Sequence, residues 1–235
     1  VVPEIASRKH IEVIAQLADQ ALEQAGLSRG DIDAVAVTYA PGLIGAVLVG
    51  VSFAKSVAYA LGVPLIPVHH VRGHIAANYL AHPDLEPPFV CLCVSGGTSL
   101  LVDVKGYTEM EILGATRDDA AGECFDKIAR VMGLGYPGGA PLDRAAQGGN
   151  DKAFSLPRVH IQDAPLDMSF SGLKTAMLNL IHNAQQKGEE LPVADLAASF
   201  SAAVSEELVP RTMAAAQAKG YGKVAVVGGV AANSR

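Results

Sequence analysis

The sequence predicts an α/β fold, and three observations support this prediction. The chain has 235 residues, of which 50% are hydrophobic, but only 5% are aromatic and none is tryptophan, so its core must be aliphatic. Short β-branched runs alternate with longer segments in which apolar residues recur at helical spacing. Glycine-rich turns follow several of these runs. Together these features are typical of layered α/β units.

The first part of the chain alternates helices and strands. Residues 10–25 carry apolar side chains at helical spacing and stop at Gly26, as a helix C-terminus does. A glycine-rich turn at 39–45 precedes a helix of small residues. The predicted helices are 10–25, 46–61 and one that starts near His70, and the predicted strands are 32–38 and 63–68.

The pattern changes after a proline- and acid-rich connector at 83–88. We therefore predict an N-terminal lobe at 1–88 and a C-terminal lobe at 89–235, both cut at their outer ends. The C-terminal lobe is expected to contain a hairpin at 89–104, helices at 119–133 and 191–219, loops at 135–141 and 150–165, and a strand at 224–227.

Composition bounds the function. The net charge of −6 argues against binding nucleic acid by bulk electrostatics, so such a contact needs a local basic surface or a partner. Three cysteines make no disulfide framework, and Cys124 is interpreted as a packing residue. The sequence opens on no signal-like segment, and no apolar stretch was expected to be long enough for a membrane span. These features favour a cytoplasmic protein without a membrane partner.

Residues 69–74 read His-His-Val-Arg-Gly-His. On a helix, the spacing of His70 and His74 stacks both imidazoles on one face, close enough to share a metal ion. The alternative is that both are ordinary surface or capping residues, which is the commoner case for histidine pairs. A third ligand is needed, and none stands nearby in the sequence.

Three glycine-rich turns lie at 95–98, 138–139 and 228–230. Glycine lets backbone amides approach a phosphate, so three such turns favour a nucleotide cleft. Tight turns also use glycine for backbone reasons alone. The sequence has neither a Gly-x-Gly-x-x-Gly fingerprint nor a Walker-type lysine.

Several acids stand near these turns. If residues 118–127 are helical, Asp119, Glu123 and Asp126 share one face, and one of them is positioned to bind ribose hydroxyls. The alternative is that these acids only complement the helix dipole. Asp143 either binds similarly or caps a helix. The segment 169–175 is either a phosphate-binding loop or an ordinary helix start.

As an ordered set, these motifs resemble the TsaD family of tRNA N6-adenosine threonylcarbamoyltransferases of the bacterial type, formerly described as O-sialoglycoprotein endopeptidases. The resemblance covers essentially the whole chain. The matching segments are 2–10, 69–74, 94–97, 118–127, 136–139, 169–176 and 228–233.

The resemblance implies an actin-like ATPase (ASKHA) fold, with two ribonuclease-H-like lobes around a nucleotide cleft. It implies transfer of a threonylcarbamoyl group from threonylcarbamoyl-AMP to the exocyclic amine of the tRNA adenosine beside the anticodon. Metal-assisted acyl transfer fits this reaction, because the tRNA amine attacks directly and no nucleophilic side chain is required. The sequence identifies no general base.

The resemblance also implies a site and partners. His70 and His74 bind one metal ion per subunit, Fe²⁺ or else zinc. The residues implied in binding the acyl-adenylate are Cys93, Val94, Ser95, Gly96, Gly97, Asp126, Gly139, Asp143 and Asn233. The partners are tRNA, a paralogous actin-like subunit and a small ATPase. The apolar stripe of residues 10–25 is the expected contact with that subunit, unless it packs on the lobe's own sheet.

The chain departs from the family pattern in three ways. The family's third metal ligand, an aspartate, and its first strand lie outside this sequence, and Thr98-Ser99 stand where bacterial members usually have histidine and threonine. We therefore expect poor metal binding and no activity from this chain alone. The alternatives are a small-molecule carbamoyltransferase or sugar kinase of the same fold, or a nucleotide-binding scaffold without catalysis.

Overall fold

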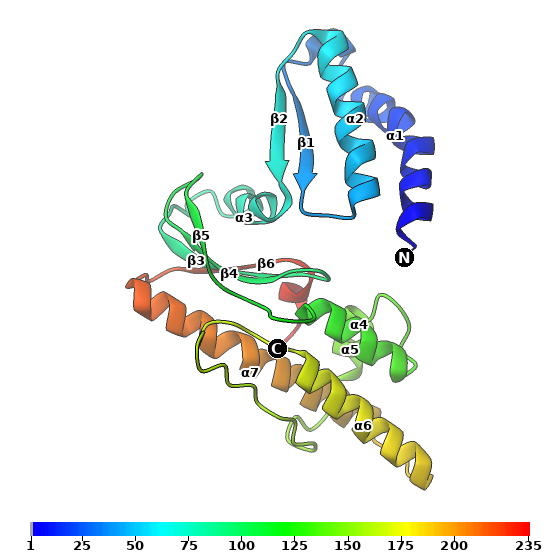
Figure 1. The fold of residues 1–235 in the computed structure, drawn as a ribbon, viewed down its shortest axis with the longest axis vertical. Coiled ribbons are helices and arrows are strands. Elements are labelled where there is room, and N and C mark those ends of the chain that lie inside the picture. The colour runs from blue at the N-terminus through cyan, green and yellow to red at the C-terminus, as the bar shows by residue number, and fades with distance from the viewer. Residues whose placement is uncertain (1) are drawn as a thin grey trace. The chain divides into compact units, whose positions relative to one another are not determined.

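A computed structural model describes residues 2–235 and divides the chain into two compact units, Val1–Ala76 (unit 1) and Ala77–Arg235 (unit 2). Figure 1 shows the order of the elements along the chain. The boundary between the units falls within helix α3 (His70–Ala81), ahead of the proline-rich connector. The lobe division at residue 88 stays a prediction.

Unit 1 is built from a two-stranded parallel sheet and two helices. Strands β1 (Val35–Ala40) and β2 (Leu65–His69) pair in parallel, joined by α2 (Ile44–Leu61). Helix α2 packs on β1, and α1 (Pro3–Ala25) packs on α2. The predicted helices and strands of this part are confirmed, with shifted ends.

Helix α1 begins seven residues before the predicted start at residue 10, at Pro3. Proline is favourable in the first helical turn, and Glu4 pairs with Arg8 at 2.7 Å one turn along. The apolar periodicity begins only at Ile11, so the apolar pattern alone marks only the later part of this helix. The helix ends at Gly26, whose φ of 67° is the left-handed conformation that glycine favours.

One expectation about membranes was wrong. Helix α2 has 18 residues and is apolar enough, by length and composition, to cross a membrane. A single such helix is weak evidence, because apolar helices of soluble proteins pass the same test.

Unit 2 contains a four-stranded sheet in the order β5-β4-β3-β6. Strands β3 (Phe89–Val94) and β4 (Ser99–Val104) form the predicted antiparallel hairpin, and β6 (Val224–Val227) pairs in parallel with β3. Strand β5 (Met110–Ala115) extends the sheet beyond β4 and was not predicted. Its edge position leaves Ile112 61% exposed, so β5 lacks the buried run that marks β3.

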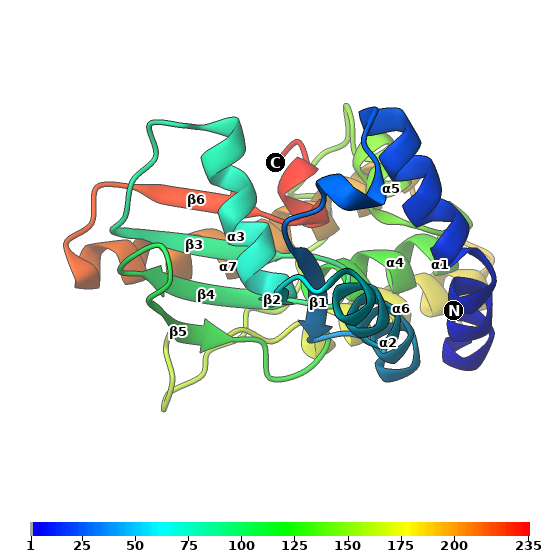
Figure 2. The same ribbon diagram turned by 90° about the horizontal axis from the view of Figure 1, so that it is seen from above.

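The helices of unit 2 that follow β5 lie on one face of this sheet, as Figures 1 and 2 show. They are α4 (Ala121–Val131), α5 (Gly139–Ala145), α6 (Ser171–Lys187) and α7 (Val193–Lys219). One interpretation is corrected here, because the predicted loop 135–141 contains the start of α5. Of the two alternatives for the segment 169–175, the structure supports the helix start, since α6 begins at Ser171. The predicted loop 150–165 is confirmed.

The core of unit 2 lies between the sheet and these helices. Phe125 of α4 and Phe200 of α7 meet edge to face, with ring centroids 5.3 Å apart. Cys124 is fully buried in the same cluster, and burial raises the pKa of its thiol to about 12. The interpretation of Cys124 as a packing residue is therefore confirmed.

Candidate functional site

The sheet of unit 2 brings two of the glycine turns to one edge. Strands β3 and β6 are parallel, and Cys93 is in register with Val227. The turns 95–98 and 228–230 follow these strands directly. Because the carboxyl ends of parallel strands meet at the same edge, the two turns lie close together, in the place where α/β proteins bind ligands.

The N-terminus of α4 docks on the first of these turns. The Ala121 amide donates to Ser99 Oγ at 2.9 Å, and the Gly122 amide donates to the Ser95 carbonyl oxygen at 3.2 Å. A Cβ atom on Gly122 would lie 2.5 Å from that carbonyl oxygen, so only glycine permits this approach. Ser99, one of the two residues that depart from the family pattern, therefore helps to hold the turn against α4.

A pocket of about 350 Å³ opens at this edge. Each of the three glycine turns contributes to its wall, through Gly96, Gly139 and Gly229. A Cβ atom at any of these three positions would meet nothing within 4 Å, so the chain leaves open space in front of them. The residues that line the pocket are Gly96, Gly122, Phe125, Asp126, Pro137, Gly139, Ala140, Asp143, Arg144, Gly229, Val230, Ala232 and Asn233.

Two carboxylates of the pocket each have one oxygen fixed by the chain. Asp126 Oδ1 accepts the Gly138 amide at 2.7 Å, which orients the start of α5. Asp143 Oδ1 accepts both the amide and the hydroxyl of Ser234, at 3.0 and 2.8 Å. Within residues 2–235, the second oxygen of each carboxylate has no protein partner. Asp143 lies inside α5 and caps no helix.

The structure brings five of the predicted binding residues to this pocket, namely Gly96, Asp126, Gly139, Asp143 and Asn233. The Ser95 amide donates to Thr98 O at 2.8 Å and closes the turn that carries Gly97. Cys93 and Val94 were also predicted to bind the ligand, but their side chains are buried and do not line the pocket. Cys93 Sγ lies 3.8 Å from Cys91 Sγ, and this contact, together with burial, raises the pKa of the Cys91 thiol.

The acids of the 118–127 segment do not form the single face that was predicted. Asp119 precedes α4 and pairs with Lys127 at 3.0 Å and with Lys174 of α6. Glu123 also binds Lys127, at 2.8 Å, so Asp126 alone faces the pocket. The hydrogen bond from Lys174 lowers the pKa of Asp119 despite its burial. Asp119 is thus occupied in joining α4 to α6.

Sequence reasoning missed the role of Asp118. This carboxylate accepts hydrogen bonds from the Phe170 amide at 2.7 Å and the Ser171 amide at 3.1 Å, at the start of α6. It also accepts the hydroxyls of Ser169 and Ser171. The paired hydroxyls flanking a helix start were the only signal, and the partner lies about fifty residues away.

The two predicted metal ligands lie together on α3, as the helical spacing requires. The Nε2 atoms of His70 and His74 are 3.1 Å apart. This separation fits two imidazoles that share an ion about 2.0–2.1 Å from each nitrogen. Burial and the neighbouring His70 lower the pKa of His74, which favours the neutral, metal-binding form. Among residues 2–235, which the structure describes, no three histidine, cysteine, aspartate or glutamate side chains come together as metal ligands.

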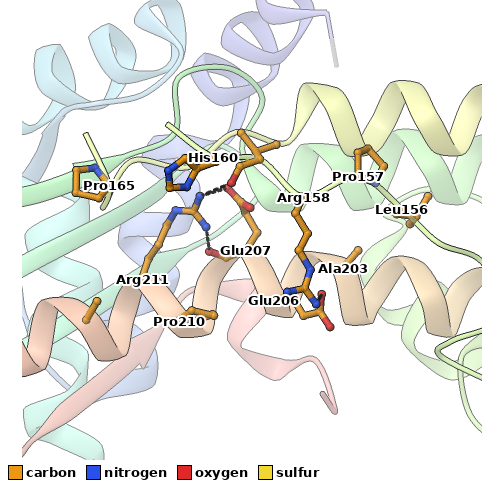
Figure 3. Close-up of a pocket in the computed structure, with 12 residues that line it drawn as sticks. Leu156, Pro157, Arg158, His160, Pro165, Ala203, Glu206, Glu207, Pro210 and Arg211 are labelled. Carbon is orange, nitrogen blue, oxygen red and sulfur yellow. Dashed lines mark hydrogen bonds and ion pairs between the residues drawn. The ribbon is translucent and has the colours of Figure 1, made fainter. Parts of the chain in front are cut away.

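Unit 2 has a second cavity of about 400 Å³, between the extended segment 156–165 and α7 (Figure 3). Arg211 dominates its wall. The guanidinium donates to the carbonyl oxygens of Asp167 at 2.7 Å and Val159 at 2.9 Å, and it pairs with the Glu207 carboxylate at 3.0 Å. The Arg211 guanidinium and the Glu207 carboxylate of this cavity therefore bind one another.

Comparison with solved structures places the fold in a known class. Thermococcus kodakarensis HypF superimposes with a TM-score of 0.69 over 95% of this chain and 38% of that chain, at 18% identity. A full-length HypF in its phosphate- and nucleotide-bound form gives a TM-score of 0.64 over 92% of this chain and 36% of that chain, at 16% identity. The protein is thus an α/β protein of the actin-like fold class, as predicted.

The chain belongs to the TsaD family, the tRNA N6-adenosine threonylcarbamoyltransferases, whose sequence profile matches residues 1–235. A Clostridium botulinum protein of that name is 54% identical over 234 residues, which cover 100% of this chain and 69% of the relative. A Clostridium perfringens protein of the same name is 53% identical over the same span. This membership favours a transferase over the kinase and scaffold alternatives.

Proposed function

We propose that the protein transfers a threonylcarbamoyl group from threonylcarbamoyl-AMP to the exocyclic amine of the adenosine beside the anticodon in tRNA. Family membership supplies the class of reaction, a tRNA threonylcarbamoyl transfer. The observation that supports the site is that three glycine turns line one pocket together with two carboxylates, each of which has one oxygen without a protein partner. The donor and the placement of its parts are our proposal.

The adenylate fits the pocket by chemistry. The phosphate lies against the turn at Gly96 and Gly97, where the absence of side chains lets backbone amides approach an anion. The free oxygens of Asp126 and Asp143 accept the ribose hydroxyls. Asn233 closes the adenine side. The volume of about 350 Å³ is within the range of small-molecule sites.

The transfer then needs no covalent enzyme intermediate. The tRNA amine attacks the acyl carbon, a C–N bond forms, and the C–O bond to the phosphate breaks. The electron pair leaves on a phosphate oxygen of AMP, and the amine loses one proton. Amides of the turn stabilise the negative charge that develops on the acyl and phosphate oxygens. Cys124 supplies no nucleophile, because its thiol is buried and its pKa is about 12.

We propose that His70 and His74 hold a metal ion, Fe²⁺ or zinc. Their Nε2 atoms at 3.1 Å and the lowered pKa of His74 support this role. When bound, such an ion would supply a Lewis acid. Because two ligands do not complete a site, we expect residues 1–235 alone to bind metal poorly and to be inactive.

We propose the cytoplasm as the location and a multiprotein complex as the working form. The paralogous actin-like subunit is expected on α1, where Ile11 is 63% and Leu17 is 56% exposed. Leu22 of the same helix lies instead beside Phe53, along a groove between α1 and α2. The helix thus presents apolar surface beyond what α2 covers. A small ATPase is the other expected partner.

The decisive experiment measures the modified nucleoside in tRNA. The complete protein with its partners, threonylcarbamoyl-AMP and unmodified tRNA should yield threonylcarbamoyladenosine, detected by mass spectrometry after digestion. Asp126→Asn should raise the KM for the adenylate by about tenfold, since a charged acceptor is replaced. Asp163→Asn, at an exposed carboxylate outside the pocket, is the matched control. Absence of the modified nucleoside with wild-type protein would refute the function.

Metal binding has its own test. His74→Ala in the complete protein should lower bound metal, measured by plasma mass spectrometry, together with transfer activity. His82→Ala removes a histidine just beyond the end of α3 and should leave the metal content unchanged. Equal metal content in the His74→Ala variant and the wild type would contradict the assignment.

A further inference from the structure

Most cations of this acidic chain are paired with carboxylates, and in unit 2 the arginines show a clear division. Arg117, Arg158, Arg211 and Arg235 each bind an aspartate or glutamate. Arg130 and Arg144 have no carboxylate partner among the residues that the structure describes. Both are exposed. With a net charge of −6, the chain has few cations available for an external anion.

Both unpaired arginines belong to the surroundings of the glycine pocket. Arg144 lines the pocket directly. Arg130 lies over the ring of Tyr136, with its Cζ 5.7 Å from the ring centroid. Tyr136 immediately precedes Pro137, which lines the same pocket. We call Arg130, Tyr136 and Arg144 the pocket rim.

The ring of Tyr136 is available to a planar ligand. Tyr136 is 60% exposed, and the Arg130 guanidinium makes a cation–π contact with its ring. A guanidinium on one face of an aromatic ring leaves the other face for stacking. Aromatic rings and cations are the groups with which proteins bind unpaired nucleotides, and Tyr136 with Arg130 on one face supplies both.

The loop that carries Tyr136 is held in place by the chain. The Leu134 amide donates to Ala129 O at 2.8 Å, and the Gly138 amide donates to Asp126 Oδ1 at 2.7 Å. A Cβ atom on Gly138 would lie 2.4 Å from Ala129 Cβ, so the loop packs closely on α4. Such anchoring lowers the entropy cost of ordering the loop when a ligand binds.

We propose that the pocket rim receives single-stranded RNA next to the acceptor adenosine. An unpaired base stacks on Tyr136, while Arg130 and Arg144 contact neighbouring phosphates. The inference rests on the proposed function, since it names the surface by which tRNA reaches the donor pocket. Arg130 and Arg144 supply a local basic contact for the RNA phosphates on a chain whose net charge of −6 disfavours binding RNA by bulk electrostatics.

The stacking role is tested with ring variants of the complete protein. Tyr136→Leu should raise the Kd for tRNA by about tenfold, the effect of losing one base–aromatic stack, and should leave the KM for the adenylate unchanged. Tyr136→Phe keeps the ring and should restore affinity to within about twofold of the wild type. The control is Tyr107→Leu, because Tyr107 is also 60% exposed but lies on the β4–β5 turn.

The phosphate contacts are tested through salt dependence. Arg144→Gln and Arg130→Gln should each weaken tRNA binding and each reduce the slope of log Kd against log salt by roughly one. Lys187→Gln is the matched control. Lys187 is an exposed cation at the C-terminal end of α6, and it has no carboxylate partner among residues 2–235. It should leave both quantities unchanged.

The outcomes separate this inference from the proposed function. Wild-type protein that modifies tRNA while Tyr136→Leu and Arg144→Gln bind tRNA normally would overturn the rim and leave the function standing. Wild-type protein that binds tRNA through the rim without modifying it would refute the function alone. Loss of a protein partner's binding in the rim variants, with tRNA affinity intact, would also overturn the proposal.

Discussion

Two cavities of unit 2 are similar in size but differ in what their charged side chains already bind. In the larger one, of about 400 Å³, the Arg211 guanidinium contacts the Glu207 carboxylate and three backbone carbonyl oxygens (Figure 3). In the smaller one, of about 350 Å³, Asp126 and Asp143 each keep one oxygen without a protein partner. The larger cavity is therefore the less suited of the two to bind a ligand.

The difference follows from how each cavity is built. Glu207 and Arg211 stand one turn apart on α7, and they tie the extended segment 156–168 to that helix. The glycine pocket is built from turns that follow two strands and precede two helices, where backbone groups have fewer intrachain partners. We therefore expect the first cavity to serve stability and the second to bind the ligand proposed for it.

Removing Arg211 should give the largest effect and sharpen this contrast. Arg211→Ala leaves the Glu207 carboxylate, only 5% exposed, without its ion pair and three carbonyl oxygens without their donor. We expect a loss of about 3–5 kcal/mol in the free energy of unfolding, measured with urea. The KM for the adenylate should stay unchanged where the variant remains folded.

The control for this change lies in the same cavity. Arg158 also pairs with a glutamate, Glu206, but its side chain is 81% exposed. Arg158→Ala should cost less than about 1 kcal/mol, because exposed ion pairs contribute little. Equal destabilisation by both variants, or a raised KM in Arg211→Ala alone, would break the distinction between the cavities.

Filling the glycine pocket should have the reverse effect: binding of the adenylate should weaken, and the free energy of unfolding should change little. Gly96→Val places a branched side chain in space that the chain leaves empty within 4 Å, so unfolding should change little. The same side chain occupies the position proposed for the phosphate, and we expect the Kd for the adenylate to rise by about a hundredfold or more.

Calorimetry with the adenylate and thermal unfolding measure these two quantities. Gly106→Val is the matched control, since Gly106 lies in the β4–β5 turn, where a Cβ atom would meet Glu109 Cβ at an ordinary 3.7 Å. Unchanged nucleotide affinity in Gly96→Val would remove the pocket from the proposed site.

The sequence predicted the parts of this contrast that depend on local pattern. The apolar run of β3 and the long helical pattern of α7 are visible in neighbouring residues, and the structure confirms both. The glycine turns were also visible, although only the parallel register of β3 with β6 brings two of them together. Edge strand β5 and the seven-residue α5 were missed, because neither carries a long apolar period.

Contacts between distant segments could not be predicted from local pattern. Asp119 was expected on a helical face with Asp126, but it pairs with Lys174, fifty-five positions along the chain. The carboxylate of Glu207 was not singled out at all, although it accepts the Ser169 amide at 3.2 Å. One sequence gives no indication of which distant carboxylate meets which donor, since only the packing of α4, α6 and α7 decides it.

The smallest expected effect concerns the segment between the two cavities, where Ser169 is held from both sides. Its amide donates to Glu207 of the larger cavity, and its hydroxyl donates to Asp118, just ahead of the helix that borders the glycine pocket. Burial acts to raise the pKa of Asp118, but the hydrogen bonds from residues 169–171 outweigh it and lower this pKa below its ordinary value of 3.8. A lowered pKa in the folded state means that the carboxylate stabilises the fold above pH 3.8, and that this stabilisation is lost as the pH falls through the folded-state value.

Asp118→Asn should therefore cost about 1 kcal/mol of unfolding free energy at pH 7 and less at pH 3, measured by urea unfolding at both pH values. Asp163→Asn, at an exposed carboxylate of the segment leading to Ser169, should cost little at either pH. The same cost for Asp118→Asn at both pH values would mean that the charge of Asp118 does not fix this segment.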